Sequence, residues 1–294
     1  MPRARANGIE LEYDTFGRED RPALLLIMGL GAQMIFWHDD FCCALAERDL
    51  HVVRFDNRDV GRSTWLDEAG MPDVMAVMAA ALQGRPVEAP YQLADMASDA
   101  AGLLDALEIR AAHVVGASMG GMIAQTLAIE HPERVRTLTS IMSTTGSRDL
   151  PPARPDAMAA LLTPIPEDRD AAIERSVQVF RVIGSPGFPF DEADMRERAA
   201  RAFDRGANPA GVVRQLVAIL ASGSRREALG AVRAPTLVIH GADDPLVPVE
   251  AGRDTAGAVP GAELLEVPGM GHDLPKPLWP TFVDAIAKLA GRPG

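Results

Sequence analysis

The chain has 294 residues, of which 47% are hydrophobic and 24% are charged, and its formal net charge is −12. These values are ordinary for a soluble globular protein, and the negative charge argues against nucleic acid or an anionic membrane surface as a partner. No apolar stretch approaches the roughly 20 residues of a membrane span, and no apolar region follows the first arginines, so we expect neither a transmembrane helix nor a signal peptide.

Short apolar runs rich in branched residues predict seven strands. The predicted strands cover residues 9–16, 23–28, 51–56, 113–117, 137–143, 236–240 and 263–267. Helical periodicity between them predicts helices over residues 41–47, 93–107, 122–130 and 281–290. Because strands and helices alternate, we expect an α/β fold whose central sheet is mostly parallel and covered by helices on both faces.

The only two cysteines, Cys42 and Cys43, are adjacent in the first predicted helix. Neighbouring thiols are poorly placed to join distant segments, so the sequence excludes a disulfide framework and a cysteine-rich metal site. We interpret them as small, partly buried thiols, in keeping with a reducing, cytoplasmic location.

The pattern changes between residues 146 and 233. Proline-rich breaks are followed by three predicted helices, near residues 168–183, 192–205 and 209–221, and by no strand. Asn208-Pro209 is a good start signal, because asparagine caps helices and proline suits the first helical position. We predict an α/β core built from residues 1–145 and 234–294, with residues 146–233 as an inserted helical cap. A smaller, methionine-rich insertion covers residues 65–90.

The stretch HVVGASMGG, residues 113–121, places a serine at the corner between a predicted strand and a predicted helix. GASMG fits the G-x-S-x-G pattern, with Gly116 and Gly120 on either side of Ser118. Small neighbours let strand and helix approach closely, and the strained turn exposes the hydroxyl at the sheet edge. Amide N–H groups at the helix start face any developing negative charge. The sequence therefore predicts Ser118 as a nucleophile.

A serine hydroxyl becomes a useful nucleophile when a base takes its proton. Of six histidines, His272 lies in the glycine-rich loop PGMGHDLP directly after the last predicted strand, where it can reach the same sheet edge. His38 follows Trp37 in a loop and has no evident partner. The loop HGADDPLVP offers Asp243 and Asp244 as carboxylates that could orient the base. Either one could also shape an Asp-Pro turn, so the residues alone leave that choice open.

Five motifs occur in order along the chain: MGLG at 28–31, DNRDVGRS at 56–63, GASMGG at 116–121, GADDPLVP at 241–248 and GMGH at 269–272. In these motifs the sequence resembles the α/β-hydrolase superfamily, and within it the aclacinomycin methylesterase-type esterases. The resemblance implies an α/β-hydrolase fold with a Ser-Asp-His order along the chain. It implies that Ser118 is the nucleophile, Asp244 the orienting acid and His272 the base.

The same resemblance implies an oxyanion hole made by the backbone N–H groups of Leu30 and Met119. Met28 and Gly29 are expected to bind substrate, and the pocket edges are expected to include Met28, Leu30, Met119, parts of the methionine-rich insertion and the cap helices. A second group of residues is expected to form a structural turn rather than to take part in chemistry. These are Asp56, Arg58 and Ser63.

These features predict a serine carboxylesterase that hydrolyses neutral, largely apolar carboxylic esters through an acyl-enzyme. The expected partner is a small-molecule ester, and the mechanism requires no metal or organic cofactor. Three other hydrolases use the same scaffold and remain as alternatives: a lactonase, a C–C bond hydrolase and a cofactor-free perhydrolase. A small-molecule receptor that keeps the fold without catalysis is an alternative from another class.

Overall fold

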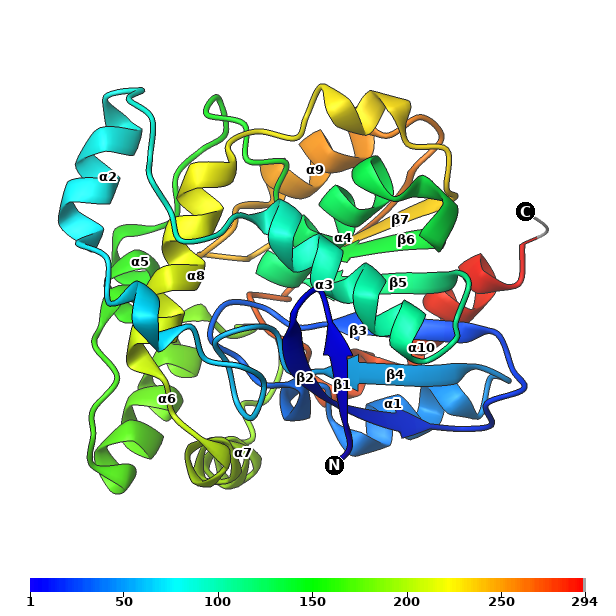
Figure 1. The fold of residues 1–294 in the computed structure, drawn as a ribbon, viewed down its shortest axis with the longest axis horizontal. Coiled ribbons are helices and arrows are strands. Elements are labelled where there is room, and N and C mark those ends of the chain that lie inside the picture. Colours follow the sequence, from blue (N-terminus) through cyan, green and yellow to red (C-terminus); the bar gives the residue numbers. More distant parts are fainter. Residues whose placement is uncertain (293–294) are drawn as a thin grey trace.

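A mostly parallel sheet forms the centre of the protein (Figure 1). The computed structural model describes residues 1–292, apart from the side chains of residues 81 and 82. Within these residues the sheet has eight strands in the order β1-β2-β4-β3-β5-β6-β7-β8. Their bounds are β1 Arg3–Ala6, β2 Ile9–Phe16, β3 Ala23–Ile27, β4 His51–Phe55, β5 Ala112–Ala117, β6 Val135–Ile141, β7 Thr236–Gly241 and β8 Glu263–Val267. The pairs β1–β2 and β2–β4 are antiparallel, and the other neighbours are parallel.

Helices cover both faces of the sheet, as the alternation of strands and helices predicted. Strand β3 is buried along its whole length, and its successive side chains point to opposite faces. Leu25 and Ile27 pack in the core that holds α3 (Leu93–Ala106) and α4 (Met119–Glu130). Leu24 and Leu26 pack in the opposite core, with α1 (Asp39–Ala46) and α10 (Trp279–Ala290). The continuous apolar run of β3 is therefore explained by burial on two sides.

All seven predicted strands are present, with ends within two residues of the predicted ones. The sequence analysis missed β1, whose Arg-Ala-Arg-Ala sequence alternates without a strongly apolar face. A signal was available in Asn7-Gly8, which joins β1 to β2 and has φ angles of 46° and 82° at the two residues. Asn-Gly between two alternating segments is a strong hairpin signal, because both turn residues need a positive φ.

Three further helices were not predicted, α2 (Val74–Leu82), α5 (Pro155–Leu162) and α9 (Val249–Ala258). Helix α9 contains many small residues and therefore has little apolar periodicity. It packs closely over the end of β7, where a Cβ atom built on Gly252 would lie 2.5 Å from Nδ1 of His240. This close packing involves a residue distant in the sequence, so the helix could not be predicted from the local pattern of apolar residues.

The segment between β6 and β7 holds helices α5, α6 (Arg169–Ile183), α7 (Glu192–Arg205) and α8 (Pro209–Ser222), and no strand among the described residues. These helices lie on the left of Figure 1, beyond the carboxyl ends of the strands. The Asn208 side chain accepts a hydrogen bond from the amide of Gly211 at 3.0 Å, so the predicted cap of α8 is confirmed. Helix α2 (Val74–Leu82), in the methionine-rich insertion, lies against α8.

Buried ion pairs join these helices to the loop after β4. Arg214 of α8 donates two hydrogen bonds to the Asp59 carboxylate, at 2.6 and 2.8 Å, and Tyr91 donates a third at 2.8 Å. The Arg214 and Asp59 side chains are 1% and 0% exposed. Arg205 of α7 lies 2.5 Å from the Asp56 carboxylate. The DNRDVGRS loop therefore holds the helical segment in place, which agrees with the structural role expected for it.

We expect Arg214→Met to lower the free energy of unfolding by about 3–5 kcal/mol, because it leaves the Asp59 carboxylate buried without its cation. Urea unfolding followed by circular dichroism measures this change. Arg169→Met is the matched control, since Arg169 pairs with Asp204 at 2.7 Å while its own side chain is 45% exposed. An exposed pair contributes little, so the control should unfold like the wild type. Equal midpoints for Arg214→Met and wild type would contradict the prediction.

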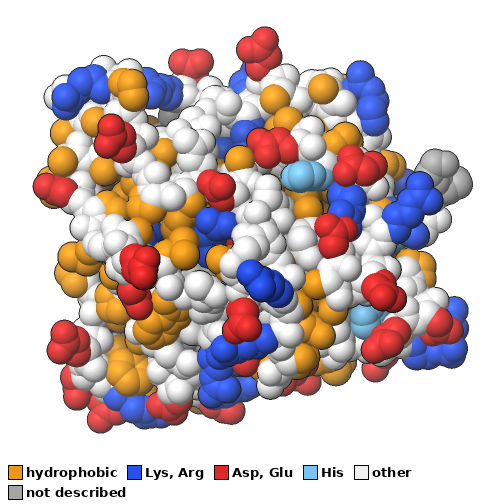
Figure 2. Space-filling view, in the orientation of Figure 1, with side chains coloured by type: hydrophobic (Ala, Val, Ile, Leu, Met, Phe, Trp, Pro, Cys, Tyr) orange, Lys and Arg blue, Asp and Glu red, His pale blue; other side chains and the backbone are white. Residues whose placement is uncertain are grey.

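The surface carries both signs of charge. Figure 2 shows hydrophobic side chains among acidic and basic ones over the side that holds α2 and α8. Met71 and Met75, beside and within α2, are among the exposed large hydrophobic residues. None of the helices in residues 1–292 combines the length and the hydropathy that a bilayer-spanning helix needs.

Candidate active site

Ser118 occupies a strained corner between β5 and α4. Its φ and ψ angles are 55° and −121°, a conformation that residues other than glycine seldom adopt. A Cβ atom on Gly116 would lie 2.0 Å from the carbonyl oxygen of Gly120, and one on Gly120 would lie 2.1 Å from that of Ile27. Strand and helix therefore approach as closely as the sequence predicted, and only glycine fits at these two positions.

Three side chains predicted from distant parts of the sequence meet at the carboxyl edge of the sheet. His272 Nε2 lies 3.0 Å from Ser118 Oγ, and His272 Nδ1 lies 2.7 Å from Asp244 Oδ2. Ser118 follows β5, Asp244 follows β7 and His272 follows β8, and parallel neighbouring strands bring these ends together. With the proton on Nδ1, the imidazole donates to the carboxylate and its Nε2 accepts from the serine hydroxyl.

The two adjacent aspartates have different partners. Asp244 Oδ1 accepts hydrogen bonds from the amides of Leu246 and Val247 at 2.9 and 2.8 Å, so its Oδ2 faces His272. Asp243 Oδ2 instead accepts from the Gly269 amide at 2.7 Å. The carboxylate that contacts the imidazole is therefore that of Asp244, and Asp243 holds the neighbouring turn.

Three other histidines have hydrogen-bond partners of their own. His240 is fully buried and its Nε2 lies 2.8 Å from the Val247 carbonyl, while burial lowers its pKa. Burial also lowers the pKa of His113, to about 4, and its Nδ1 lies 2.9 Å from Thr137 Oγ1. His38, which lacked an evident partner in the sequence, accepts from the Asp40 amide at 3.1 Å and caps α1.

The loop after β3 lies against the serine. A Cβ atom on Gly29 would lie 3.1 Å from the Cβ of Ser118, so Gly29 and Leu30 border the nucleophile position. Met119 is the first residue of α4. Within residues 1–292, neither the Leu30 amide nor the Met119 amide donates a hydrogen bond to another residue. Both predicted oxyanion donors are therefore available.

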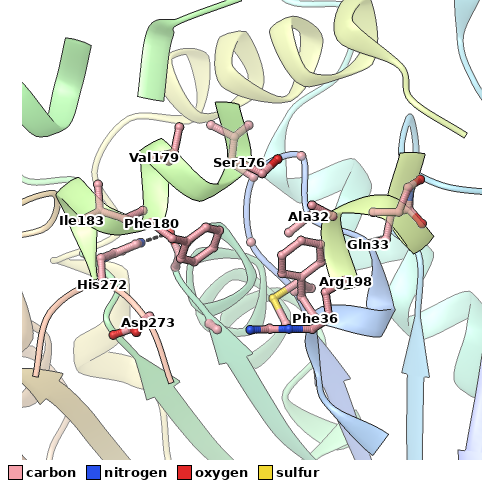
Figure 3. A pocket seen from close by; sticks show the side chains of 18 of the residues that line it. Ala32, Gln33, Phe36, Ser176, Val179, Phe180, Ile183, Arg198, His272 and Asp273 are labelled. Carbon is pink, nitrogen blue, oxygen red and sulfur yellow. Dashed lines mark hydrogen bonds between the residues drawn. The ribbon is translucent and has the colours of Figure 1, made fainter. Parts of the chain in front are cut away.

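A cavity of about 640 Å³ lies between this sheet edge and the helical segment. Met28, Gly29, Leu30, Ser118 and His272 contribute to its wall. The rest of the wall is predominantly apolar, with side chains from α6, α7 and α8 opposite the sheet edge (Figure 3). Apolar residues of the wall, from these helices and from other parts of the chain, include Phe36, Phe41, Val179, Phe180, Ile183, Met195, Phe203, Leu216 and Trp279.

Two expectations about the pocket edges were wrong. The Met119 side chain is fully buried in the core on the α3–α4 face of the sheet and does not reach the cavity. No described side chain of the methionine-rich insertion lines the cavity, because α2 packs on the outer side of α8. The described apolar residues of that helix pack against α8 or lie at the surface, and the sequence alone could not distinguish either position from a pocket wall.

The backbone of the His272 loop is bound to the segment that ends α6. The His272 amide donates to the Ile183 carbonyl at 2.7 Å, and the Gly187 amide donates to Gly269 at 2.9 Å. Ser185 Oγ accepts from the Gly271 amide at 2.9 Å and donates to the Asp273 carboxylate. Sequence reasoning missed Ser185 and Asp273, since a lone serine in a loop carries no signal of its own. Hydrogen bonds to the helical segment therefore help to position the loop that carries His272.

We expect Ser185→Ala to lower kcat for ester hydrolysis by about three- to tenfold, the size of one lost hydrogen bond in a positioning role. Burial raises the Asp273 pKa, and the Ser185 hydroxyl opposes that rise, so the variant also favours protonated Asp273 beside His272. Initial rates between pH 5 and 9 measure both effects. Thr163→Val is the control, because that hydroxyl bonds only the Ala159 carbonyl of its own helix. An unchanged rate and pH profile for Ser185→Ala would contradict the prediction.

Comparison with known proteins places the chain in a family. The sequence profile of the α/β-hydrolase fold matches residues 22–275, and the chain belongs to that family. Rhodomycin D methylesterase DnrP of Streptomyces peucetius is 32% identical over 272 residues, which cover 86% of this chain and 85% of the relative. 3-oxoadipate enol-lactonase 2 of Acinetobacter baylyi is 30% identical over 253 residues, covering 84% and 81%. The crystal structure of a hydrolase from Pseudomonas aeruginosa has a TM-score of 0.72 at 26% identity, covering 98% of this chain and 97% of the other.

The described residues contain no group of three or more His, Cys, Asp or Glu side chains arranged to hold a metal ion.

Proposed function

We propose that the protein is a serine carboxylesterase that hydrolyses neutral, largely apolar carboxylic esters. The observation that carries the proposal is the hydrogen-bonded chain from Asp244 through His272 to Ser118 at the wall of an apolar cavity. Relatives named as methylesterases, at 32% and 33% identity over 86% of the chain, support ester hydrolysis as the reaction. The net charge of −12 favours a small neutral molecule over nucleic acid as the partner.

In the proposed mechanism Ser118 Oγ attacks the ester carbonyl carbon while His272 Nε2 accepts its proton. Asp244 keeps the proton on Nδ1 and stabilises the imidazolium that forms. The carbonyl oxygen becomes an oxyanion that accepts hydrogen bonds from the Leu30 and Met119 amides. The C–O bond then breaks, and the alcohol leaves with the proton from His272. Water attacks the acyl-enzyme with His272 again as the base, which releases the carboxylic acid and restores Ser118.

Met28 and Gly29 are proposed to contact the acyl carbon region of the substrate, because both line the cavity next to Ser118. Residues 146–233 are proposed to act as the cap over a core formed by residues 1–145 and 234–294. The apolar side chains that this cap contributes to the cavity favour a hydrocarbon or aromatic ester body.

Initial rates on p-nitrophenyl esters of increasing acyl length test the proposal. An apolar cavity of about 640 Å³ predicts that kcat/KM rises from acetate to a medium-length acyl chain and then falls. Failure to hydrolyse any acyl ester would sink the esterase assignment. Failure of a fluorophosphonate to label Ser118 would favour the non-catalytic receptor instead.

Lactone hydrolysis is the second candidate, because one relative at 30% identity is named an enol-lactonase. A lactone is a cyclic ester, and the same three groups would open it. In that reaction the leaving alcohol stays attached to the acyl group. Parallel assays on lactones and open-chain esters of equal carbon number distinguish the two substrates.

A further inference from the structure

Two chain segments that lie far apart in the sequence meet beside the candidate base. One is residues 184–187, directly after α6, and the other is residues 269–272, in the loop after β8. Figure 3 shows Ile183, the last residue of α6, next to His272. The His272 amide donates to the Ile183 carbonyl at 2.7 Å. The helical segment and the loop of the base are therefore joined directly through their backbones.

Glycines on both sides make this contact close. A Cβ atom built on Gly187 would lie 2.6 Å from the Cα atom of Gly269, and one built on Gly271 would lie 2.3 Å from the carbonyl oxygen of Gly184. Neither Gly187 nor Gly271 has a positive φ angle, so the local conformation does not require glycine at these two positions. The close approach of the two backbones requires it.

The loop is held from two sides, and the two sides hold different residues. On the side of the sheet, the Asp243 amide donates to the Met270 carbonyl at 3.0 Å. His272 itself makes only one backbone hydrogen bond among the described residues, and its acceptor is Ile183. The carbonyl at the end of α6 is therefore the nearest backbone support of the imidazole.

We propose that Gly187 and Gly271 are positioning residues for the candidate base. Because they have no side chain, the end of α6 comes close enough for the Ile183 carbonyl to hold the His272 amide. That contact aligns His272 Nε2 on Ser118 Oγ, 3.0 Å away. A larger residue at either glycine position pushes the two segments apart and displaces the imidazole. This inference rests on the proposed esterase function, and it adds that the helical segment determines how well the base works.

A displaced imidazole should affect different esters unequally. His272 takes the proton of Ser118 Oγ for every ester, but it also gives a proton to the leaving alcohol. p-Nitrophenolate is a stable anion that leaves without this proton, whereas a more basic leaving group depends on it. A misplacement of about 1 Å can cost on the order of 10²-fold in rate. The loss should therefore grow as the leaving group becomes more basic.

A series of substituted phenyl esters of one acid, from p-nitrophenyl to unsubstituted phenyl, tests the inference. We expect Gly187→Ala to lower kcat/KM by about tenfold for the p-nitrophenyl ester and by about 100-fold for the phenyl ester. Gly187 does not line the cavity, so the wall that contacts the substrate keeps its residues. Gly271→Ala should change the two rates in the same way.

Two further variants serve as comparisons. Gly257→Ala is the matched control, because Gly257 is an exposed glycine of α9 and no atom lies within 4 Å of its added Cβ. It should keep the wild-type rates for every ester. Ser185→Ala removes the hydrogen bond to the Gly271 amide without adding an atom, so it should shift the ratio of the two rates in the same direction by about threefold. Thermal melting measures how far each variant is destabilised.

The ratio of the two rates separates positioning from folding. A smaller folded fraction lowers the rates for both esters equally and cancels in the ratio. Equal losses for the p-nitrophenyl and phenyl esters in Gly187→Ala would overturn the inference, and so would wild-type rates in both Gly187→Ala and Gly271→Ala. A wild type that hydrolyses no ester of the series shows instead that the proposed esterase function is wrong.

Discussion

Ser118→Ala is expected to lower kcat for ester hydrolysis by at least about 10⁴-fold, the loss typical of removing a triad nucleophile. The hydroxyl is the atom that forms the acyl-enzyme, and no other hydroxyl is hydrogen-bonded to His272 among the described residues. The fold should survive, because alanine keeps the Cβ atom at the strained corner and the change removes only the oxygen of a partly buried side chain. Single-turnover rates on the preferred p-nitrophenyl ester measure the loss.

Ser224→Ala is the control for this variant, since Ser224 is an exposed serine in the loop after α8. It should keep the wild-type rate and remain labelled by a fluorophosphonate, whereas Ser118→Ala should not be labelled. If Ser118→Ala hydrolyses the ester at the wild-type rate while correctly folded, Ser118 is not the nucleophile and the proposed mechanism is wrong.

Asp244→Asn should lower kcat by about 10²–10⁴-fold although the substitution changes the shape of the side chain very little. The amides of Leu246 and Val247 both donate to Oδ1, so the asparagine must place its carbonyl oxygen there. Its NH₂ group then faces His272 Nδ1, which has to become the acceptor. The imidazole proton moves to Nε2, and the nitrogen next to Ser118 can no longer take the hydroxyl proton.

Asp243→Asn is the matched control, because it makes the same chemical change one residue earlier. The Asp243 carboxylate accepts a hydrogen bond from the Gly269 amide, and among the described residues it makes no hydrogen bond with His272. An asparagine oxygen can accept that hydrogen bond, so we expect less than a tenfold change in kcat. Similar losses in the two variants would show that the turn as a whole matters and that Asp244 does not orient the base through its carboxylate. A crystal structure of Asp244→Asn would show the orientation of the amide through its hydrogen-bond partners.

Local sequence signals were enough to predict most strands of the sheet and the helices with strong apolar periodicity. Residues 9–16 and 263–267 were predicted with the bounds that the structure has. Helix α4 begins three residues earlier than predicted, at Met119, because the turn at Ser118 is tighter than a propensity argument assumes. Strand β1 and helix α9 were missed because both depend on a partner, the β2 hairpin edge for one and the glycine contact with His240 for the other.

The candidate site could be predicted from the sequence because several of its residues adopt backbone arrangements that only particular residue types allow. The glycines around Ser118 and the loop with His272 stand out in the sequence because their backbones make contacts that larger residues prevent. The residues that form the cavity wall carry no comparable signal in the sequence. Ser185, in the loop after α6, and Asp273, in the loop after β8, are ordinary polar residues in the sequence, and only their neighbours make them different from exposed ones.

The sequence by itself determined the class of fold, the buried strands to within two residues at each end, and Ser118 and His272 as the proposed nucleophile and base, because period, turn chemistry and order along the chain can be read from the sequence alone. The tertiary structure decided which aspartate contacts His272 and which helices line the cavity at Ser118. Those properties depend on distances between residues far apart in the chain. They are set by how the sheet edge and the helices pack together, and one-dimensional spacing carries no information about them.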